Sequence, residues 1–504
     1  MSLAVKPSAR LFLSLLMGYV LIHLLIRLAM GGTLEMDEAE QLILGQQLAL
    51  GYNTQPPLYS WLQWLFFQML GEGVFCLALL KSILLFSIYL FTWLIARSLI
   101  STPRIALLAT FSLFLIPSIA WESVRDLTHS VLATAIAAAT FYTAIHIHQK
   151  RSLVGYVMLG VLLACGMLAK YSFGLFALSL LLAAGSLPEY RRLLLDRRIA
   201  VTAAIALLLV TPHLLWATAH LNEISGFIAN EVGEGQQTAY FDGLLSGVTS
   251  LTASGAEFLV LVWLVLTLLF SSAYRGLPVG ETNIYRQLVA RFLIAGLLLC
   301  AILIALGATQ FQSRWFQPLL FIFPLYLISR ADAAGVSKRR EMVLRSVVVF
   351  FAVIVIVLRF SQFWLAPYME RNPNRMQYPS AELAEQLRQQ GFNGGTIIGD
   401  SNLTASNIGL YFDGARILSP KTEFFTVDNN PPSVDGQCLI AWNANRRDLL
   451  PNVLSEYLRR QGIVVTAAKQ HYISAPYQYT DRGEHRIGYI LLGSETICNN
   501  AATD

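Results

Sequence analysis

Residues 36–40 of the chain read Met-Asp-Glu-Ala-Glu, and residues 51–58 read Gly-Tyr-Asn-Thr-Gln-Pro-Pro-Leu. Both stretches follow an apolar run at 11–30 that is long enough to cross a bilayer. Because no Lys or Arg occurs from Leu28 to Leu80, we expect no cation of the local chain to neutralise the three acids. They are either solvated loop charges or are used by groups far away in the sequence, and we favour the second interpretation.

The composition indicates a membrane protein that crosses the bilayer several times. Of the 504 residues, 55% are hydrophobic and only 13% are charged, with a mean hydropathy of +0.55, whereas soluble domains carry about 25% charge. The net charge is +5, but the informative feature is where the cations fall along the chain, so nucleic-acid binding is a poor explanation for it. The run at 11–30 is too long for a cleavable signal, and we interpret it as a true first helix.

The sequence contains about eleven apolar segments of spanning character. They lie at 11–30, 76–96, 104–120, 127–147, 153–169, 171–187, 199–219, 251–271, 288–308, 315–330 and 346–366. With a cytoplasmic N-terminus, nearly all Lys and Arg of the connections fall on the inner side, as the positive-inside rule requires. The segments 31–75, 121–126, 220–250 and everything after about 366 are then outside.

Three cations break this rule at outer membrane boundaries, namely Arg125, Lys170 and Arg314. Each is explained singly by interfacial anchoring, with its stem along lipid and its head among the headgroups. We consider it less plausible that all three are incidental. For Arg27 and Lys81, near the outer ends of the first two spans, anchoring is the preferred interpretation.

The first outer loop is expected to hold two short helices. Residues 37–50 have helical character with Gly51 as the stop, and neighbours three and four apart share a face, so Asp37 faces Glu40 rather than Glu38. Pro57 begins a second, strongly apolar helix that is too short to span before Gly71. We expect it to lie at the headgroup level.

The motifs of this loop resemble the first periplasmic loop of the C-type glycosyltransferases. The most similar branch contains the dolichyl-phosphate-mannose protein mannosyltransferases and the bacterial aminoarabinose lipid A transferases. Three further stretches agree with that family over about residues 10–330. They are Trp-Glu-Ser-Val-Arg-Asp-Leu at 121–127, Gly-Met-Leu-Ala-Lys-Tyr at 166–171, and Gln-Ser-Arg-Trp-Phe-Gln-Pro-Leu-Leu at 312–320. Many relatives carry a charged residue where this chain has Gln55, which leaves the sugar and acceptor open.

The resemblance implies a polyprenyl-phosphate sugar donor, a glycan, lipid or protein acceptor, and inverting displacement. It implies Asp37 as catalytic base, Glu38 as an orienting or substrate-binding partner, and Asp126 as a second acid in the same cavity. Arg314, Lys170 and Arg125 would bind the leaving phosphate, because Arg and Lys suit phosphate oxygens. Tyr52 and Gln55 would contact substrate. The implied location is a bacterial inner membrane.

Structural alternatives stand beside these roles. Asp37 could be a helix N-cap, Asp126 a cap of the fourth span or a partner of Arg125, and Arg314 a boundary anchor. His129 is left out as a structural hydrogen-bonder. No zinc spacing occurs, and the sequence requires no cofactor, although a divalent ion between Glu38 and Asp126 is compatible with it. The Gly-bearing loop at 220–250 is either a flap or a solvated connection, and we slightly favour the connection.

The composition changes after Pro367 and predicts a small α/β domain over 367–504 beside a transmembrane domain over 1–366. Strands are expected at 396–399, 415–418, 438–441, 463–465 and 489–492, and helices at 380–390, 403–411 and 448–460. Cys438 and Cys498 both fall in this outer domain, so we predict a disulfide between them.

Two other classes of function were considered. A transporter or lipid-handling protein without chemistry would show paired half-repeats with charges at midplane depth. We find no internal repeat, and the charges gather at one face, which favours an enzyme. An inactive relative whose outer domain binds a partner is the third alternative.

Overall fold

A computed structural model describes residues 7–52, 55–233, 240–275, 283–365, 373–422, 436–445, 448–463, 465, 470–481 and 483–493. The chain divides into two compact units. Unit 1 comprises Met1–Ile22, Thr54–Leu58 and Lys81–Ile356. Unit 2 comprises His23–Asn53, Tyr59–Leu80 and Val357–Asp504. Helices α1 (Pro7–Ala29), α4 (Val74–Leu99) and α17 (Lys338–Trp364) pass from one unit into the other.

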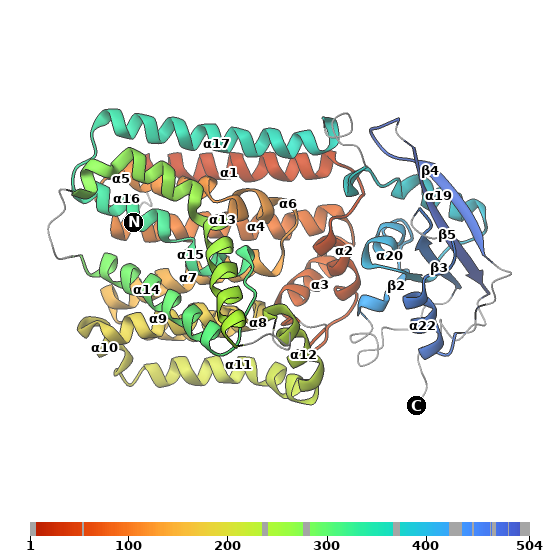
Figure 1. The fold of residues 1–504 in the computed structure, drawn as a ribbon, viewed down its shortest axis with the longest axis horizontal. Coiled ribbons are helices and arrows are strands. Elements are labelled where there is room, and N and C mark those ends of the chain that lie inside the picture. Colours follow the sequence, from red (N-terminus) through yellow and green to blue (C-terminus); the bar gives the residue numbers. More distant parts are fainter. Residues whose placement is uncertain are drawn as a thin grey trace. The chain divides into compact units, whose positions relative to one another are not determined.

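Unit 1 is a bundle of apolar helices (Figure 1). Besides the three shared helices it contains α5 (Pro103–Phe111), α6 (Ser123–Arg125), α7 (His129–Lys150), α8 (Leu153–Ala169), α9 (Phe173–Ser186), α10 (Pro188–Leu194), α11 (Ile199–Ala219), α12 (Leu221–Val232), α13 (Tyr240–Arg275), α14 (Ile284–Ala305), α15 (Gln317–Leu320) and α16 (Phe323–Ala333). Short turns named η1 (Ser112–Leu115), η2 (Ser118–Glu122) and η3 (Ser313–Phe316) interrupt them. Its aromatic core includes Phe12 stacked on Trp93, with ring centroids 4.6 Å apart.

Seven helices of the described chain are long and apolar enough to cross a membrane, namely α1, α4, α7, α11, α13, α14 and α17. Two bent pairs bring this number to nine if each pair is one span. In the first pair, α5 with η1 (Pro103–Leu115) is followed by the helical residues Ser118–Arg125 at a bend of 81°. In the second pair, α9 is followed by α10 at a bend of 116°. Helix α8 is apolar but shorter. The protein is therefore a multi-pass, mostly helical membrane protein.

Two expectations for unit 1 are wrong in detail. The expected span at 315–330 is not one helix but the succession η3, α15 and α16. Pro318 and Pro324 stand in the first turns of α15 and α16, where a missing N–H is tolerated, but neither could continue a preceding helix. The expected loop at 220–250 is largely helical, because α12 and the start of α13 occupy it.

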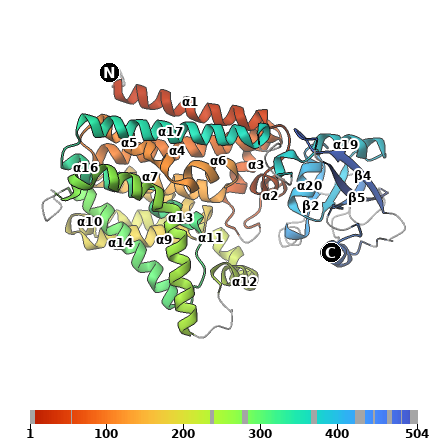
Figure 2. The same cartoon turned by 45° about the horizontal axis from the view of Figure 1, so that its top comes forward.

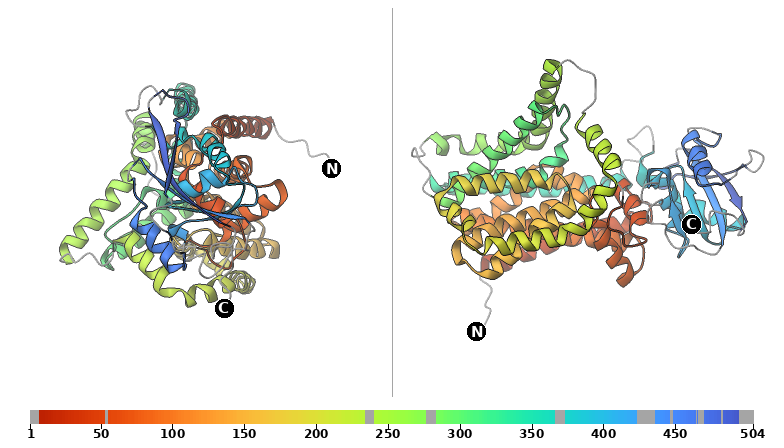
Figure 3. Two further views of the ribbon diagram at one scale, coloured as in Figure 1. Left: turned by 90° about the vertical axis from the view of Figure 1, so that its right-hand side faces the viewer. Right: turned by 90° about the horizontal axis from the view of Figure 1, so that it is seen from below.

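Unit 2 contains a five-stranded mixed sheet in the order β2-β1-β3-β5-β4 (Figure 2). The strands are β1 (Gly395–Gly399), β2 (Arg416–Leu418), β3 (Gln437–Asn443), β4 (His471–Pro476) and β5 (Glu484–Leu492). The first three pair in parallel, and β5 pairs antiparallel with both β3 and β4. Figure 3 shows this sheet from two further sides.

Helices cover both faces of the sheet, as parallel strands require. Successive residues of β1 point to opposite faces, so Ile397 packs with α19 (Ser380–Gln389) and α20 (Asn402–Gly409), while Ile398 packs with α22 (Asn452–Arg460). The predicted helices and four predicted strands are thus present. The expected strand at 463–465 is wrong for its described residues, because Gly462 at φ +71° ends α22 and Ile463 packs directly into the core below the sheet.

Unit 2 also contains α2 (Met36–Leu44) and α3 (Leu58–Leu70). Helix α2 ends at Gly45 instead of Gly51. A Cβ at Gly45 would lie 2.7 Å from the Phe67 ring of α3, so only glycine permits this approach. The side-chain amide of Gln46 then exchanges two hydrogen bonds of 2.9 Å with the backbone of Ile417 in β2. The first outer loop is therefore bound to the C-terminal sheet.

Candidate active site

The acids at 37 and 38 occupy different environments at the start of α2. Glu35 is the N-cap residue, and its backbone N–H donates to Glu38 Oε2 over 3.1 Å in a capping box. Asp37 is not the N-cap, but it lies in the first turn of α2, where a carboxylate stabilises the helix as the structural alternative expected; its side chain is half-buried. Burial and then the charges of Asp37 and Glu38 raise the pKa of Tyr59 well above its usual value, which keeps this phenol neutral.

Glu38 has a counter-charge that the sequence analysis did not expect. Arg27 donates from Nε to Glu38 Oε1 over 2.9 Å and from Nη2 to Oε2 over 2.6 Å, and both side chains are buried. Arg27 is only 4% exposed, so its interpretation as a lipid-headgroup anchor is wrong. Gly31 at φ +79° reverses the chain after α1, which returns residue 38 to the side of residue 27.

Tyr52 and Gln55 lie in different units. The Tyr52 hydroxyl donates to the carbonyl of Gln47 over 2.7 Å and accepts the N–H of Ala49 over 3.2 Å. Burial raises the pKa of Tyr52, so this phenol stays neutral and holds the loop. Gln55 faces a cavity of unit 1, and Thr54 beside it lies outside the described residues.

Two of the four motifs meet inside unit 1 at one buried glutamine. Gln317 of α15 donates from Nε2 to the Ser118 carbonyl over 2.7 Å and to the Ser123 hydroxyl over 3.0 Å. Its Oε1 accepts the hydroxyl of Thr134 in α7 over 3.3 Å. The segment 312–320 is thereby tied to the segment 121–127. The sequence analysis quoted Gln317 as part of its motif but missed this structural role. The available signal was a polar residue placed between the aromatic Phe316 and Pro318.

Four charged side chains gather near Glu122 on this polar turn. The charges of Arg125, Glu257, Asp126 and Arg314 all act on the Glu122 carboxyl. Asp126, Arg125 and Arg314 therefore lie in the same region of unit 1, together with Glu122 and Glu257. Asp126 is not the cap of α7, whose N-cap is Thr128. Lys81 donates to the carbonyls of Arg125 and Asp126 over 3.4 and 3.1 Å and is 5% exposed, so its anchoring role is also wrong.

Lys170 lies in the break between α8 and α9. Its Nζ donates to the hydroxyl of Ser130 in α7 over 2.6 Å, and His129 Nδ1 lies 3.2 Å from the Ala169 carbonyl. His129 is thus a structural hydrogen-bonder, as expected. A Cβ at Gly166 would lie 2.2 Å from the Phe173 ring, so this glycine permits the close packing that presents Lys170.

A cavity of about 510 Å³ opens beside Lys170. Its polar lining consists of Gln55, Lys170, Tyr171 and Ser172. The remaining walls are mostly aliphatic and aromatic side chains of α9, α14 and the segment around η3, including Leu175, Leu178, Leu299, Ile302, Leu303, Leu306, Phe311, Trp315 and Phe316. A largely apolar cavity with a cation and an amide in its lining suits an amphiphile whose headgroup is anionic.

The predicted residues fall into two groups. Gln55 and Lys170 share the cavity, while Arg125, Asp126 and Arg314 share the charge cluster, all within unit 1. Asp37, Glu38 and Tyr52 belong to unit 2. Among the described residues, no group of three or more His, Cys, Asp or Glu side chains could hold a metal ion. Cys438 is disulfide-bonded, and its expected partner Cys498 lies outside the described residues.

Comparison with known proteins identifies the class of this bundle. The chain superimposes on the crystal structure of ArnT from Cupriavidus metallidurans bound to undecaprenyl phosphate, with a TM-score of 0.59 at 12% identity, covering 96% of this chain and 98% of the other. It also matches mycobacterial arabinofuranosyltransferase AftD with a TM-score of 0.50 at 13% identity, covering 96% of this chain and 40% of AftD. The fold is that of polytopic membrane glycosyltransferases.

The sequence relatives give the family. The chain is 32% identical to the lipopolysaccharide core galacturonosyltransferase RgtB of Rhizobium johnstonii, over 94% of this chain and 96% of RgtB. It is 26% identical to RgtA of the same organism, over 96% and 97% of the two chains. Residues 54–216 match the family described as dolichyl-phosphate-mannose-protein mannosyltransferase, and the chain belongs to that family of membrane glycosyltransferases. The predicted resemblance is confirmed, and the transporter alternative is not favoured.

Proposed function

We propose that this enzyme transfers a uronic acid, galacturonic acid in the first instance, from a polyprenyl-phosphate carrier to the lipopolysaccharide core. The names of its two relatives support the sugar and the acceptor, and the undecaprenyl phosphate bound to ArnT supports the carrier. The observation that carries the proposal is the apolar cavity with Lys170 and Gln55 in its wall. Lys170 suits the carrier phosphate, and the apolar walls suit the prenyl chain.

The reaction we propose is a single displacement with inversion. An acceptor hydroxyl oxygen bonds to the anomeric carbon, while the bond from that carbon to the phosphate oxygen breaks on the opposite face. Asp37 takes the hydroxyl proton as general base. The bonding electrons leave with the polyprenyl phosphate, whose growing charge is stabilised by Lys170, Arg314 and Arg125.

The other predicted residues have supporting roles in this proposal. Glu38, held by Arg27, fixes the first turn of α2 and so orients Asp37. Asp126 is the second acid and balances the cations beside it. Tyr52 and Gln55 contact substrate, and the Gln55 amide can donate a hydrogen bond to a sugar carboxylate without repelling it.

We propose that the bundle over 1–366 crosses the bacterial inner membrane eleven times, with a cytoplasmic N-terminus. The charge asymmetry of the connections supports an odd number of crossings. The short helix α8, the bent pairs and the broken segment η3–α15–α16 account for the crossings beyond the seven long helices. The α/β domain over 367–504 then lies on the periplasmic side, and α3 lies at the membrane surface.

We propose that transfer requires no metal ion. Both Glu38 oxygens already accept hydrogen bonds from Arg27, so Glu38 is poorly placed to bind a divalent cation together with Asp126. Extensive dialysis against EDTA should leave the transfer rate within about twofold of the untreated rate. A loss that Mg²⁺ or Mn²⁺ restores would overturn this statement.

The site hypothesis is tested by Lys170→Gln, assayed for transfer of galacturonic acid from its polyprenyl phosphate to core lipopolysaccharide in membranes. Loss of a preorganised group that stabilises developing charge should reduce the rate about 100-fold or more. Lys338→Gln, on an exposed lysine at the start of α17, is the matched control and should transfer normally. Undiminished transfer by Lys170→Gln would remove this residue from the site.

The catalytic base is tested separately with Asp37→Asn. Transfer should be lost while the carrier still binds, because the phosphate-binding cations are unchanged. Asp242→Asn, on an exposed carboxylate at the start of α13, is the control. Normal transfer by Asp37→Asn would exclude Asp37 as the base, and absence of transfer by the wild-type protein would favour an inactive relative.

A further inference from the structure

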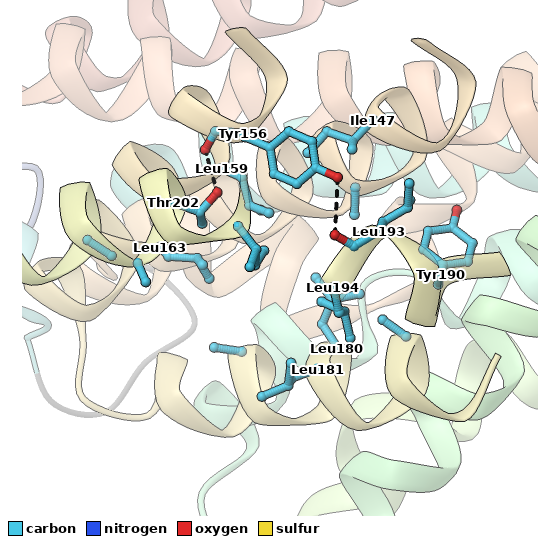
Figure 4. A pocket seen from close by; sticks show the side chains of 16 residues that line it. Ile147, Tyr156, Leu159, Leu163, Leu180, Leu181, Tyr190, Leu193, Leu194 and Thr202 are labelled. Atoms are coloured by element: carbon cyan, nitrogen blue, oxygen red, sulfur yellow. Dashed lines mark hydrogen bonds between the residues drawn. The ribbon is translucent and has the colours of Figure 1, made fainter. Parts of the chain in front are cut away.

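A second cavity in unit 1 shares no lining residue with the first. It has a volume of about 260 Å³ and lies between helices α7, α8, α9, α10 and α11 (Figure 4). Its walls are almost entirely aliphatic, and the polar side chains among them are Tyr156, Tyr190 and Thr202. The proposed glycosyl transfer does not use this space.

Two of these polar side chains are satisfied within the protein. The Tyr156 hydroxyl donates to the carbonyl of Leu193 in α10 over 3.1 Å, and the Thr202 hydroxyl donates to the Tyr156 carbonyl over 2.7 Å (Figure 4). These bonds tie α8 to α10 and α11 and fix the shape of the cavity. They leave the aliphatic walls for an apolar occupant.

The third polar group is not satisfied. The Tyr190 side chain is 3% exposed, and its hydroxyl has no hydrogen-bond partner among the described residues. The ring stacks on His148 with centroids 4.9 Å apart, so the hydroxyl cannot easily turn away. An unpaired buried hydroxyl carries a desolvation penalty, which a ligand oxygen would offset.

Four arginines lie at the ends of helices that enclose the same cavity, outside its lining. The charges of Arg151 and Arg198 act on the Tyr156 hydroxyl, and the Arg198 guanidinium donates to the Arg151 carbonyl. Arg191 and Arg192 are exposed on α10 next to Tyr190. Against these four arginines stand Glu189 and Asp196, and Asp196 lies 4.0 Å from Arg198. Four exposed arginines against two acids leave this rim with net positive charge, which attracts an anionic headgroup.

We propose that this cavity binds one anionic phospholipid. An acyl chain occupies the aliphatic space, a lipid oxygen accepts the Tyr190 hydroxyl, and the phosphate lies with Arg151 and Arg198. Basic pockets between membrane helices on the cytoplasmic side bind phospholipid headgroups in this way. The lipid would fix α10 against α8 and α9, and would be bound independently of the sugar carrier.

The test uses the full chain in nanodiscs of phosphatidylcholine, with phosphatidylglycerol as the probe and native mass spectrometry as the readout. The double variant Arg151→Gln/Arg198→Gln should retain phosphatidylglycerol about tenfold less than the wild type. The matched control Lys338→Gln/Arg339→Gln removes the same charge from exposed positions at the start of α17 and should behave as the wild type. Equal loss in both double variants would reduce the effect to general surface charge and overturn the proposal.

Two further variants separate the chain from the headgroup. Tyr190→Phe keeps the ring and removes the hydroxyl, and Ala203→Phe fills the cavity without changing any charge. Both should weaken retention of phosphatidylglycerol, and neither should affect phosphatidylcholine. If sn-glycerol 3-phosphate displaces the lipid fully, or if both variants retain it normally, the site recognises a free phosphate and the acyl-chain cavity is not involved.

Discussion

Arg27 and Glu38 form the buried ion pair on which the start of α2 depends. Removing two charges from water is costly, and their attraction compensates only when the geometry is good and the remaining donors are satisfied. Arg27 meets this condition, since it also donates to the carbonyls of Gly31 and Thr33 over 3.1 and 2.8 Å. The pair therefore connects the end of α1 to the loop that carries Asp37.

Breaking this pair from either side should destabilise the protein strongly. Arg27→Met and Glu38→Gln should each lower the free energy of unfolding by about 3–5 kcal/mol, because each leaves one buried charge alone. The double variant should lose much less than the two losses combined. Denaturant unfolding of the purified protein in detergent measures this cycle.

Arg375 offers the control, because it lies 3.9 Å from Glu35 but is 49% exposed. Arg375→Gln should cost less than about 1 kcal/mol. Additive losses for the Arg27 and Glu38 variants would contradict the pairing.

The sequence analysis singled out the charged and polar residues of the motifs, but it could not predict which side chains they contact. Arg27 stands directly before the cation-free segment, and its place at a helix end made lipid anchoring the simpler interpretation. Its pairing depends on the reversal at Gly31, which brings together residues eleven positions apart. Gln317 shows the same limit, since its partners Ser118 and Ser123 are nearly 200 positions away.

At the scale of elements, hydrophobic patterning predicted the helices well and the sheet in part. Strands β1, β2, β3 and β5 are apolar runs buried on both faces, so they stand out in the sequence. Strand β4 was missed because it is an edge strand whose residues are mostly exposed or half-buried. The end of α2 at Gly45 was missed because it depends on Phe67, a tertiary contact.

Strand β5 contains a buried histidine that should make the sheet sensitive to acid. Burial lowers the pKa of His485 to about 4, and its Nδ1 lies 3.1 Å from the Tyr477 hydroxyl. The folded protein therefore keeps His485 neutral, while the unfolded chain binds a proton below about pH 6.5. Above pH 6.5 His485 is neutral in both states and does not lower the free energy of unfolding. As the pH falls from 6.5 toward 4, protonation of the unfolded chain lowers the free energy of unfolding progressively, by about 3 kcal/mol at most.

Hydrogen exchange of the β4 and β5 amides in the full chain should report this loss. Protection should fall between pH 6.5 and 4.5 in the wild type, after correction for intrinsic exchange, and much less in His485→Gln. The control His471→Gln, on an exposed histidine of β4, should keep the wild-type profile. An unchanged pH profile in His485→Gln would show that another group is responsible.

For the whole molecule, one arrangement follows from contacts within each unit. In unit 2 the loop with Asp37 is held by the C-terminal sheet layer, through Asn407, which accepts the N–H of Leu34, and Ser406, which donates to the carbonyl of Ala39. In unit 1 the phosphate-binding candidates are held by Gln317 and Ser130. The sequence analysis assigned all of these motifs to one side of the membrane, but it could not show that the C-terminal domain holds the loop that carries Asp37.

The disulfide tests this placement across the membrane. Cys438 is disulfide-bonded, whereas Cys76, Cys165 and Cys300 are free. Disulfides persist in oxidising compartments, so a bond between Cys438 and Cys498 requires a periplasmic C-terminal domain. Maleimide labelling of the denatured protein should modify three cysteines before reduction and all five after it. Cys498→Ser should add one label before reduction, by freeing Cys438, while Cys165→Ser should remove one under both conditions. Labelling of all five cysteines without reductant would contradict both the disulfide and the periplasmic location.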